Sequence, residues 1–220
     1  MGFINKFIKE NKHFWWVLSL LPVLLWFKIL ESTLTPQYTI HTVWDNRIPF
    51  LKIFVIPYVL WFLYIAFGII YTGLHDKKDF YRLLISLGAG MSVAYIIYMI
   101  FPNGLDLRPV VTGNDVLSNL VKFIYATDTP TNVCPSVHVI NSMAVNTALI
   151  NSKDFGARKH LKAASNILNI LICLSTVFIK QHSVIDVMSG LIVASALYIC
   201  VYYIPSLKFI RGSQQHSTIK

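Results

Sequence analysis

The sequence is poor in charge. Only 13% of its 220 residues are Asp, Glu, Lys or Arg, whereas 55% are hydrophobic and the mean hydropathy is +0.58. Because a soluble domain carries about 25% charged residues, this composition excludes an ordinary soluble domain and predicts an integral membrane protein. The length suits one compact bundle, so residues 1–220 are expected to form a single domain.

Cysteine and clustered metal ligands are also scarce. The three cysteines, Cys134, Cys173 and Cys200, are scattered without the spacing of a metal site, and Cys173 and Cys200 are expected to be small buried hydrophobic residues. No run of His, Asp and Glu has metal-ligand spacing, so we expect no metal and no other cofactor. No small-residue cleavage site follows the first apolar run, which is therefore expected to stay in the protein.

The apolar runs predict an all-α bundle of six membrane-crossing helices. They cover residues 14–30, 50–73, 83–101, 137–151, 163–179 and 185–205. All but the fourth approach the ~20 residues that cross the hydrocarbon layer. The fourth is shorter and contains Asn141, Ser142 and Asn146, which suits a helix buried inside the bundle. Residues 1–13 oppose Phe and Ile to Lys, which predicts an interfacial segment.

The net charge of +9 has a strong bias between the two predicted sides of the membrane. Six spans place both termini on one side, where the connections hold 13 Lys and Arg, whereas the other side holds six. The positive-inside rule then predicts a multi-pass protein of the cell membrane with cytoplasmic termini. The basic residues are thus expected to contact membrane lipids and not nucleic acid. The sequence carries no signal for an oligomeric state.

Three polar clusters lie at the ends of apolar runs. His182 and Asp186 are four residues apart, so on a helix they share one face, and the carboxylate can hold one imidazole nitrogen while the other attacks or takes a proton. A second histidine, His138, follows Ser136, and Arg108 precedes a proline. All three clusters fall on the predicted outer side, so we expect one site at the outer face.

In this order, the clusters resemble the motifs of the type 2 phosphatidic acid phosphatase (PAP2) superfamily, which read Lys-x6-Arg-Pro, Pro-Ser-Gly-His and Ser-Arg-x5-His-x3-Asp. The matching residues are Arg108-Pro109, Pro135-Ser136-Val137-His138, and Ser175 with His182 and Asp186, within roughly residues 83–200. The resemblance implies a six-helix PAP2-type (acid phosphatase/vanadium haloperoxidase-like) bundle and a phosphohistidine on His182. His138 would act as general acid and then base, and Asp186 would orient His182.

The resemblance also implies a phosphate-binding set. Arg108 would clamp two oxygens with its fork, and Ser136 with the backbone N–H groups of Val137 and His138 would bind others at a helix N-terminus. The chain departs from the family where Val137 replaces the glycine of Pro-Ser-Gly-His.

Two basic residues of the family motifs are missing. The lysine of the first motif falls at Phe101, and the arginine of the third falls at Thr176. Lys180 lies four residues after Thr176, on the same face if the helix continues, and is expected to supply the missing charge.

Three functions fit these residues. The first is a lipid phosphatase that hydrolyses phosphatidic acid, phosphatidylglycerophosphate or a polyprenyl pyrophosphate. The second is a lipid phosphotransferase, similar to sphingolipid or inositol-phospholipid synthases, in which an alcohol replaces water. The third is a membrane protein without enzymatic activity. Between the first two motifs, an apolar stripe over residues 116–124 predicts a short helix on the membrane surface that covers the site entrance, guides a lipid into it, or only packs.

Overall fold

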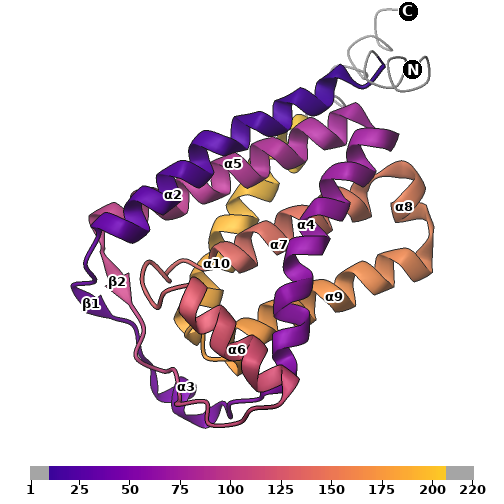
Figure 1. The fold of residues 1–220 in the computed structure, drawn as a ribbon. Helices are drawn as coiled ribbons and strands as arrows, with labels where there is room; N and C mark the ends of the chain where they lie inside the picture. Colours follow the sequence, from indigo (N-terminus) through magenta and orange to yellow (C-terminus); the bar gives the residue numbers. More distant parts are fainter. Residues whose placement is uncertain (1–9, 207–220) are drawn as a thin grey trace, which may run out of the picture.

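The computed structural model describes residues 10–206, which are mostly helical (Figure 1). The prediction of an all-α protein is therefore confirmed. The only strands in that range, β1 (Tyr38–Thr39) and β2 (Asn103–Gly104), are two residues long and pair in parallel. Residues 1–9 of the predicted interfacial segment lie outside the described range.

Five helical segments in the described range are long and apolar enough to cross a membrane, which makes this a membrane protein. Their bounds are Lys12–Thr33 (a 3-10 helix, Lys12–Leu20, continued by α2, Leu21–Thr33), Lys52–His75 (a 3-10 turn, Lys52–Phe54, continued by α4, Val55–His75), α5 (Lys77–Ile100), α9 (Lys159–Phe178), and Val184–Ser206 (α10, Val184–Tyr198, continued by a π-helix, Ile199–Tyr203).

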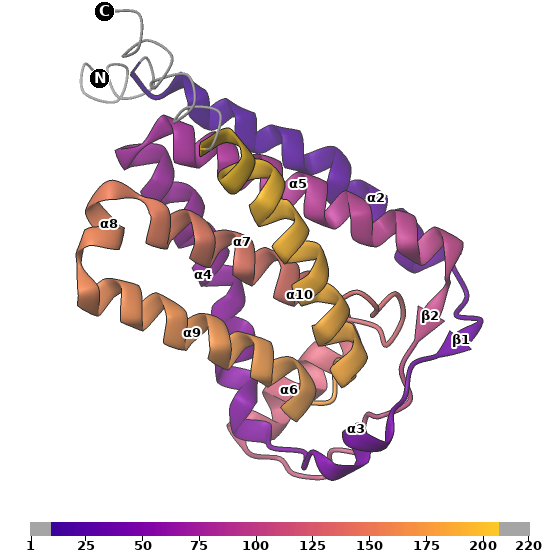
Figure 2. The same ribbon diagram turned by 180° about the vertical axis from the view of Figure 1, so that it is seen from behind.

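The fourth predicted run forms α7 (Val137–Asn151), which is shorter than these five and lies at the centre of the bundle. It packs against α4, α5, α9 and α10 (Figures 1 and 2). Its polar side chains Asn141, Ser142 and Asn146 are buried, and Asn146 bonds Ser165 and Asn166 of α9. The expectation of a buried, partly polar helix is confirmed, because helix neighbours supply the partners that lipid does not.

Three connections, two of them long, meet at one end of the bundle, which we call the long-connection end. They are residues 34–51, 101–136 and the short stretch 179–183, and the first contains α3 (Val43–Arg47). The β1–β2 pairing joins the first two, and a bridge from Gly104 to Thr131 folds the second on itself. The connections α4–α5 and α7–α9, the latter with α8 (Lys153–Ala157), lie at the other end (Figure 2).

The apolar stripe of the second connection forms α6 (Val116–Thr127), as predicted. Its inner residues Val121 and Ile124 pack with Val55 of α4 and Ile179 after α9, whereas Phe123 is exposed. The side chains of Ile124 and Thr127 also line the cavity described below. This short helix therefore packs on the bundle and forms part of a cavity wall.

Two glycines of α5 provide a test of the tight packing around α7. A Cβ added at Gly90 would lie 2.5 Å from Cγ2 of Ile140, whereas one added at Gly88 would meet only Leu20, at 3.7 Å. Alanine at either position gains helix propensity, about 1 kcal/mol, but overpacking costs about 1–3 kcal/mol. We expect Gly90→Ala to lower the melting temperature and Gly88→Ala to leave it equal or higher, measured by thermal unfolding in detergent. Equal effects would contradict this packing.

Candidate functional site

The two histidines of the sequence motifs lie side by side. His138 is in the first turn of α7, and His182 directly precedes Ser183, the N-cap of α10. Their ring centroids are 5.6 Å apart with the planes at 63°. The backbone holds these helix starts together, because Ser136 N donates to the carbonyl of Asp186 at 3.0 Å. Both rings face one cavity, so the structure brings together residues 44 positions apart in the chain.

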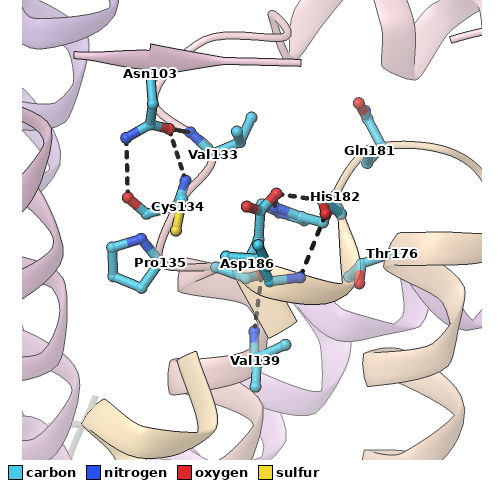
Figure 3. A network of polar contacts seen from close by, with 12 residues as sticks. Asn103, Val133, Cys134, Pro135, Val139, Thr176, Gln181, His182 and Asp186 are labelled. Atoms are coloured by element: carbon cyan, nitrogen blue, oxygen red, sulfur yellow. Dashed lines mark hydrogen bonds and ion pairs between the residues drawn. The ribbon is translucent and has the colours of Figure 1, made fainter. Parts of the chain in front are cut away.

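His182 is oriented by Asp186, as the spacing predicts. Nδ1 of His182 lies 3.3 Å from Oδ2 of Asp186, and both side chains are buried (Figure 3). The same carboxylate oxygen accepts the N–H of Ser183 at 2.8 Å, which completes a capping box at the start of α10. With Nδ1 directed at the carboxylate, Nε2 is the ring nitrogen left for chemistry.

His138 is held by aromatic rings. Its imidazole contacts the rings of Tyr58 and Trp61 of α4, with centroid distances of 4.5 and 4.3 Å. The indole N–H of Trp61 donates to the His138 carbonyl at 3.2 Å. Nε2 of His138 is buried and has no hydrogen-bond partner among the described residues. A buried nitrogen without a partner costs free energy, so it is available to a ligand in the cavity.

The segment that carries His182 is fixed by α3, a contact that the sequence does not reveal. The Asp45 carboxylate accepts the Ser183 hydroxyl at 2.7 Å and the Val184 N–H at 2.9 Å. The Lys180 ammonium donates to the carbonyls of Asp45 and Ile48 at 2.7 and 2.6 Å. Contacts to the first connection thus hold the chain on both sides of His182.

Asp45 also bonds Thr42, whose N–H and hydroxyl donate to the same carboxylate at 2.7 and 2.8 Å. Burial alone would raise the pKa of Asp45, but the hydrogen bonds from Ser183, Val184 and Thr42 together hold this pKa below its ordinary value of 3.8. Hydrogen bonds to the charged form favour ionisation. Asp45 is therefore an ionised cap of α10.

Asn103 shapes the loop before α7. Its Oδ1 accepts the N–H groups of Val133 and Cys134 at 2.9 and 2.8 Å, and its Nδ2 donates to the carbonyls of Phe101 and Cys134 at 2.8 and 3.0 Å (Figure 3). The Tyr98 hydroxyl donates to the Pro135 carbonyl at 2.6 Å. These contacts set where α7, and with it His138, begins.

Arg108 is near the site but not in the cavity wall. Its guanidinium donates to the carbonyls of Tyr125 and Asp128 at 3.1 and 2.6 Å and to Oε1 of Gln181, and it lies over the Tyr125 ring. Only Nε is buried without a partner in the described range. Most of the guanidinium fork is thus bonded to protein oxygens, including that of Gln181, the neighbour of His182 in the chain, and the two-oxygen clamp stays a prediction.

Lys180 and Thr176 also differ from the prediction. Helix α9 ends at Phe178, and Lys180 has a left-handed backbone with φ 58°, so the two do not share a helical face. The Lys180 ammonium bonds α3 carbonyls, as above, and the Thr176 hydroxyl bonds the Cys173 carbonyl at 2.8 Å. The Thr176 carbonyl accepts the N–H groups of Gln181 and His182. Neither side chain lines the cavity.

Ser136 and Val137 complete the predicted set. The Ser136 hydroxyl caps α7, accepting the Val139 N–H at 3.4 Å, and is fully buried outside the cavity wall. The Val137 side chain packs against the core and lines the cavity. Of the eight predicted residues, His138, His182 and Val137 face the cavity, Asp186 lies behind His182, and the other four serve the surrounding structure.

The cavity has a volume of about 690 Å³. Its polar end contains both histidines and the residues Glu31, Asp128, Thr129, Thr131, Asn132 and Gln181. Its other walls are mostly apolar and are formed by the helical segment Lys12–Thr33, α4 and α5. On α4 the lining runs from Tyr58 to Ile69, which corresponds to about 16 Å at 1.5 Å per residue. The two histidines therefore sit at the polar end of a long apolar cavity.

Sequence reasoning missed Gln181, Asn132, Asp128 and Asp45. Gln181 lies between Lys180 and His182 in the chain, and residues 127–132 form a polar stretch between apolar segments. These two signals indicate a polar surface near the histidines, but they do not predict which side chains contact one another.

The chain matches no protein-family model, no curated protein and no solved structure.

Removing the Asp45 carboxylate tests the contact with α3. The native-state pKa of Asp45 is depressed, so its contribution to stability is complete above about pH 4 and is lost as pH falls through the native pKa. Asp45→Ala leaves the Ser183 hydroxyl and Val184 N–H unpaired, which costs about 1–3 kcal/mol.

We expect thermal unfolding of Asp45→Ala at pH 7 to show this loss, and the difference from the parent to shrink toward pH 3. Asp115→Ala is a matched control, because Asp115 caps α6 and pairs with Lys52 at an exposed site. If Asp115→Ala were the more destabilising, the assigned role of Asp45 would be wrong.

Lys180→Met distinguishes a structural lysine from a ligand. It removes two hydrogen bonds from a charged group to carbonyls, so we expect the unfolding free energy to drop by about 1–3 kcal/mol. With any lipid that the parent protein turns over, the KM of folded Lys180→Met should stay within about twofold of the parent KM, because the ammonium does not line the cavity. A large rise in KM with an unchanged melting temperature would instead identify Lys180 as a phosphate ligand.

Proposed function

We propose that this protein is a membrane enzyme that cleaves the phosphate ester of a lipid through a phosphohistidine on His182, with water as the final acceptor. The arrangement of two imidazoles and a carboxylate around one cavity carries this proposal. Lipid phosphates and pyrophosphates of the kinds named above are the candidate substrates. The six-span PAP2 arrangement, the outer-face site and the cell-membrane location belong to the same proposal.

The roles follow from the two environments. Nε2 of His182 attacks phosphorus while Asp186, at Nδ1, stabilises the imidazolium that forms. His138, 5.6 Å away between ring centroids, donates a proton to the leaving alkoxide and then takes one from water. This assignment requires the phosphorus to lie between the nucleophile and the proton donor, and the contact of the two rings supports it.

The cavity supports a lipid substrate. Its apolar walls extend about 16 Å along α4 from the histidines, so an acyl or prenyl chain can lie inside the bundle while its phosphate reaches the polar end. A water-soluble phosphate ester would leave this apolar surface without a partner.

A second candidate is lipid phosphotransfer, in which an alcohol takes the phosphoryl group in place of water. One observation favours it: no Lys or Arg side chain of the described range lines the cavity. The doubly charged phosphate of a monoester is therefore less well neutralised than the singly charged phosphate of a diester, which is the donor in a headgroup transfer.

His182→Ala and His138→Ala test the chemistry. With lipid phosphates in detergent, we expect His182→Ala to abolish turnover and His138→Ala to slow it roughly 10²–10⁴-fold, the usual range for a lost general acid. Phosphate release and chromatography of the labelled lipid products are measured together. His75→Ala is the control, since His75 is an exposed side chain at the far end of α4.

The same assay separates the alternatives. Free phosphate as the labelled product supports hydrolysis, and label found only in a second lipid supports transfer. EDTA should leave the rate unchanged and vanadate should inhibit, because charge stabilisation is assigned to protein groups and the attack passes through five-coordinate phosphorus. Turnover that persists in His182→Ala would refute the proposed nucleophile, and an inert parent protein across the whole lipid panel would favour the non-enzymatic alternative.

A further inference from the structure

The polar end of the cavity contains two buried amides without partners. Gln181 is 2% exposed and Asn132 is 5% exposed, and both line the cavity. In the described part of the chain, neither Nε2 of Gln181 nor Nδ2 of Asn132 has a partner that meets hydrogen-bond geometry, and the Tyr58 hydroxyl is the side-chain group that lies close to the Gln181 amide. Buried donors are paired in nearly all native proteins, so two such groups beside the histidines indicate a ligand that accepts hydrogen bonds.

The orientation of Gln181 is fixed by chemistry. Arg108 donates to the side-chain oxygen of Gln181, and a guanidinium has no acceptor. The atom that faces Arg108 must therefore be Oε1, which leaves the N–H groups of Nε2 as the free end of the amide. Arg108 thus acts on the cavity through Gln181, and its positive charge polarises the amide whose donors remain free.

Asn132 has a different constraint. Its backbone is left-handed, with φ 56°, and its N–H donates to the carbonyl of Asn103 at 2.7 Å. Asn is the non-glycine residue that accepts this conformation most readily, and such residues are enriched at ligand sites. The turn places the amide of Asn132 in the same wall as Gln181 and His182.

The charges around this wall are already matched. Glu31 and Asp128 line the cavity. Lys28 pairs with Glu31 at 2.9 Å, and the Asp128 carboxylate accepts the Tyr58 hydroxyl at 2.5 Å and attracts the Arg108 guanidinium. Lys180 bonds the carbonyls of Asp45 in α3 and of Ile48 directly after it. This wall therefore presents neutral amides where the sequence predicts two cations, and neutral donors suit one negative charge better than two.

We propose that the side-chain amides of Gln181 and Asn132 form the phosphate-binding subsite and that it takes the singly charged phosphate of a lipid phosphodiester in preference to a doubly charged monoester. For its lipid substrate the proposal rests on the second candidate function, headgroup transfer from a lipid phosphodiester. In this proposal Arg108 is a positioning residue, which orients the Gln181 amide by donating a hydrogen bond to its oxygen.

Two lipids with one difference in charge test it. Phosphatidic acid and phosphatidylmethanol with the same short chains are titrated into purified protein in detergent by calorimetry, in a His182→Ala background that blocks turnover. At pH 8 we expect the diester to bind about tenfold more tightly, and at pH 5.5 the two to approach each other, because the second pKa of a phosphomonoester is about 6. Tighter binding of phosphatidic acid at pH 8 would overturn the charge preference.

Gln181→Glu tests the donor itself. Glutamate keeps an oxygen for Arg108, so the melting temperature should be retained, but it removes both N–H donors and adds a negative charge. We expect diester affinity to fall about tenfold or more, and Asn132→Asp to act in the same direction. Gln37→Glu, the same change at an exposed position of the first connection, should bind like the parent.

Diester affinity within about twofold of the parent in a folded Gln181→Glu would refute the subsite. This outcome is distinct from failure of the proposed function, which would appear as no turnover of any lipid by protein with His182 intact, while the binding titrations still decide the role of Gln181.

Discussion

The structure of the site depends on the buried carboxylate of Asp45. It joins the first connection to the start of α10, 138 residues later in the chain, through the Ser183 hydroxyl and the Val184 N–H. Residues 179–181 have other long-range hydrogen bonds, from the Lys180 ammonium, to the Ile179 carbonyl and to the Gln181 side chain, but none of these bonds involves the start of α10. Because a helix N-terminus leaves donors unpaired, an ionised carboxylate there both satisfies them and opposes the helix dipole. The position of His182 follows from this contact.

Two helix N-termini meet at the cavity, but they differ in what is left for a ligand. The start of α10 is occupied by Asp45 and Asp186, so its dipole is already neutralised. The start of α7 has only the neutral hydroxyl of Ser136 as its cap, and no carboxylate accepts from it in the described contacts. The positive end of α7, which carries His138, is therefore the one that remains to favour an anion.

The fold was largely predictable because its signals are local. The length of an apolar run is enough to predict a membrane-crossing helix. The run at 137–151 has the same bounds as α7, and its predicted burial is also observed. The predicted and observed helix ends differ by several residues where polar residues extend a helix beyond its apolar part. Helix α5 begins at Lys77 and not at residue 83, because the Asp76 side chain caps it by accepting the N–H groups of Lys78 and Asp79.

Contacts in the site were predictable only between residues one helical turn apart. Four-residue spacing places His182 and Asp186 together, and the structure confirms that contact. The same spacing failed for Thr176 and Lys180, because the helix ends between them, and such an ending is set by tertiary contacts to α3. Asp45, Asn103 and Asn132 act across distances in the chain that no periodicity encodes.

The fates of Arg108 and Lys180 have one physical cause. A cation close to an apolar cavity loses solvation, and it recovers free energy most easily from fixed carbonyl oxygens nearby. Lys180 meets the carbonyls of Asp45 and Ile48, and Arg108 those of Tyr125 and Asp128. The two basic residues that the motifs assign to a ligand thus hold the connections in place by hydrogen bonds to their carbonyls. The neutral amide of Gln181, polarised by Arg108, is the donor that lines the cavity.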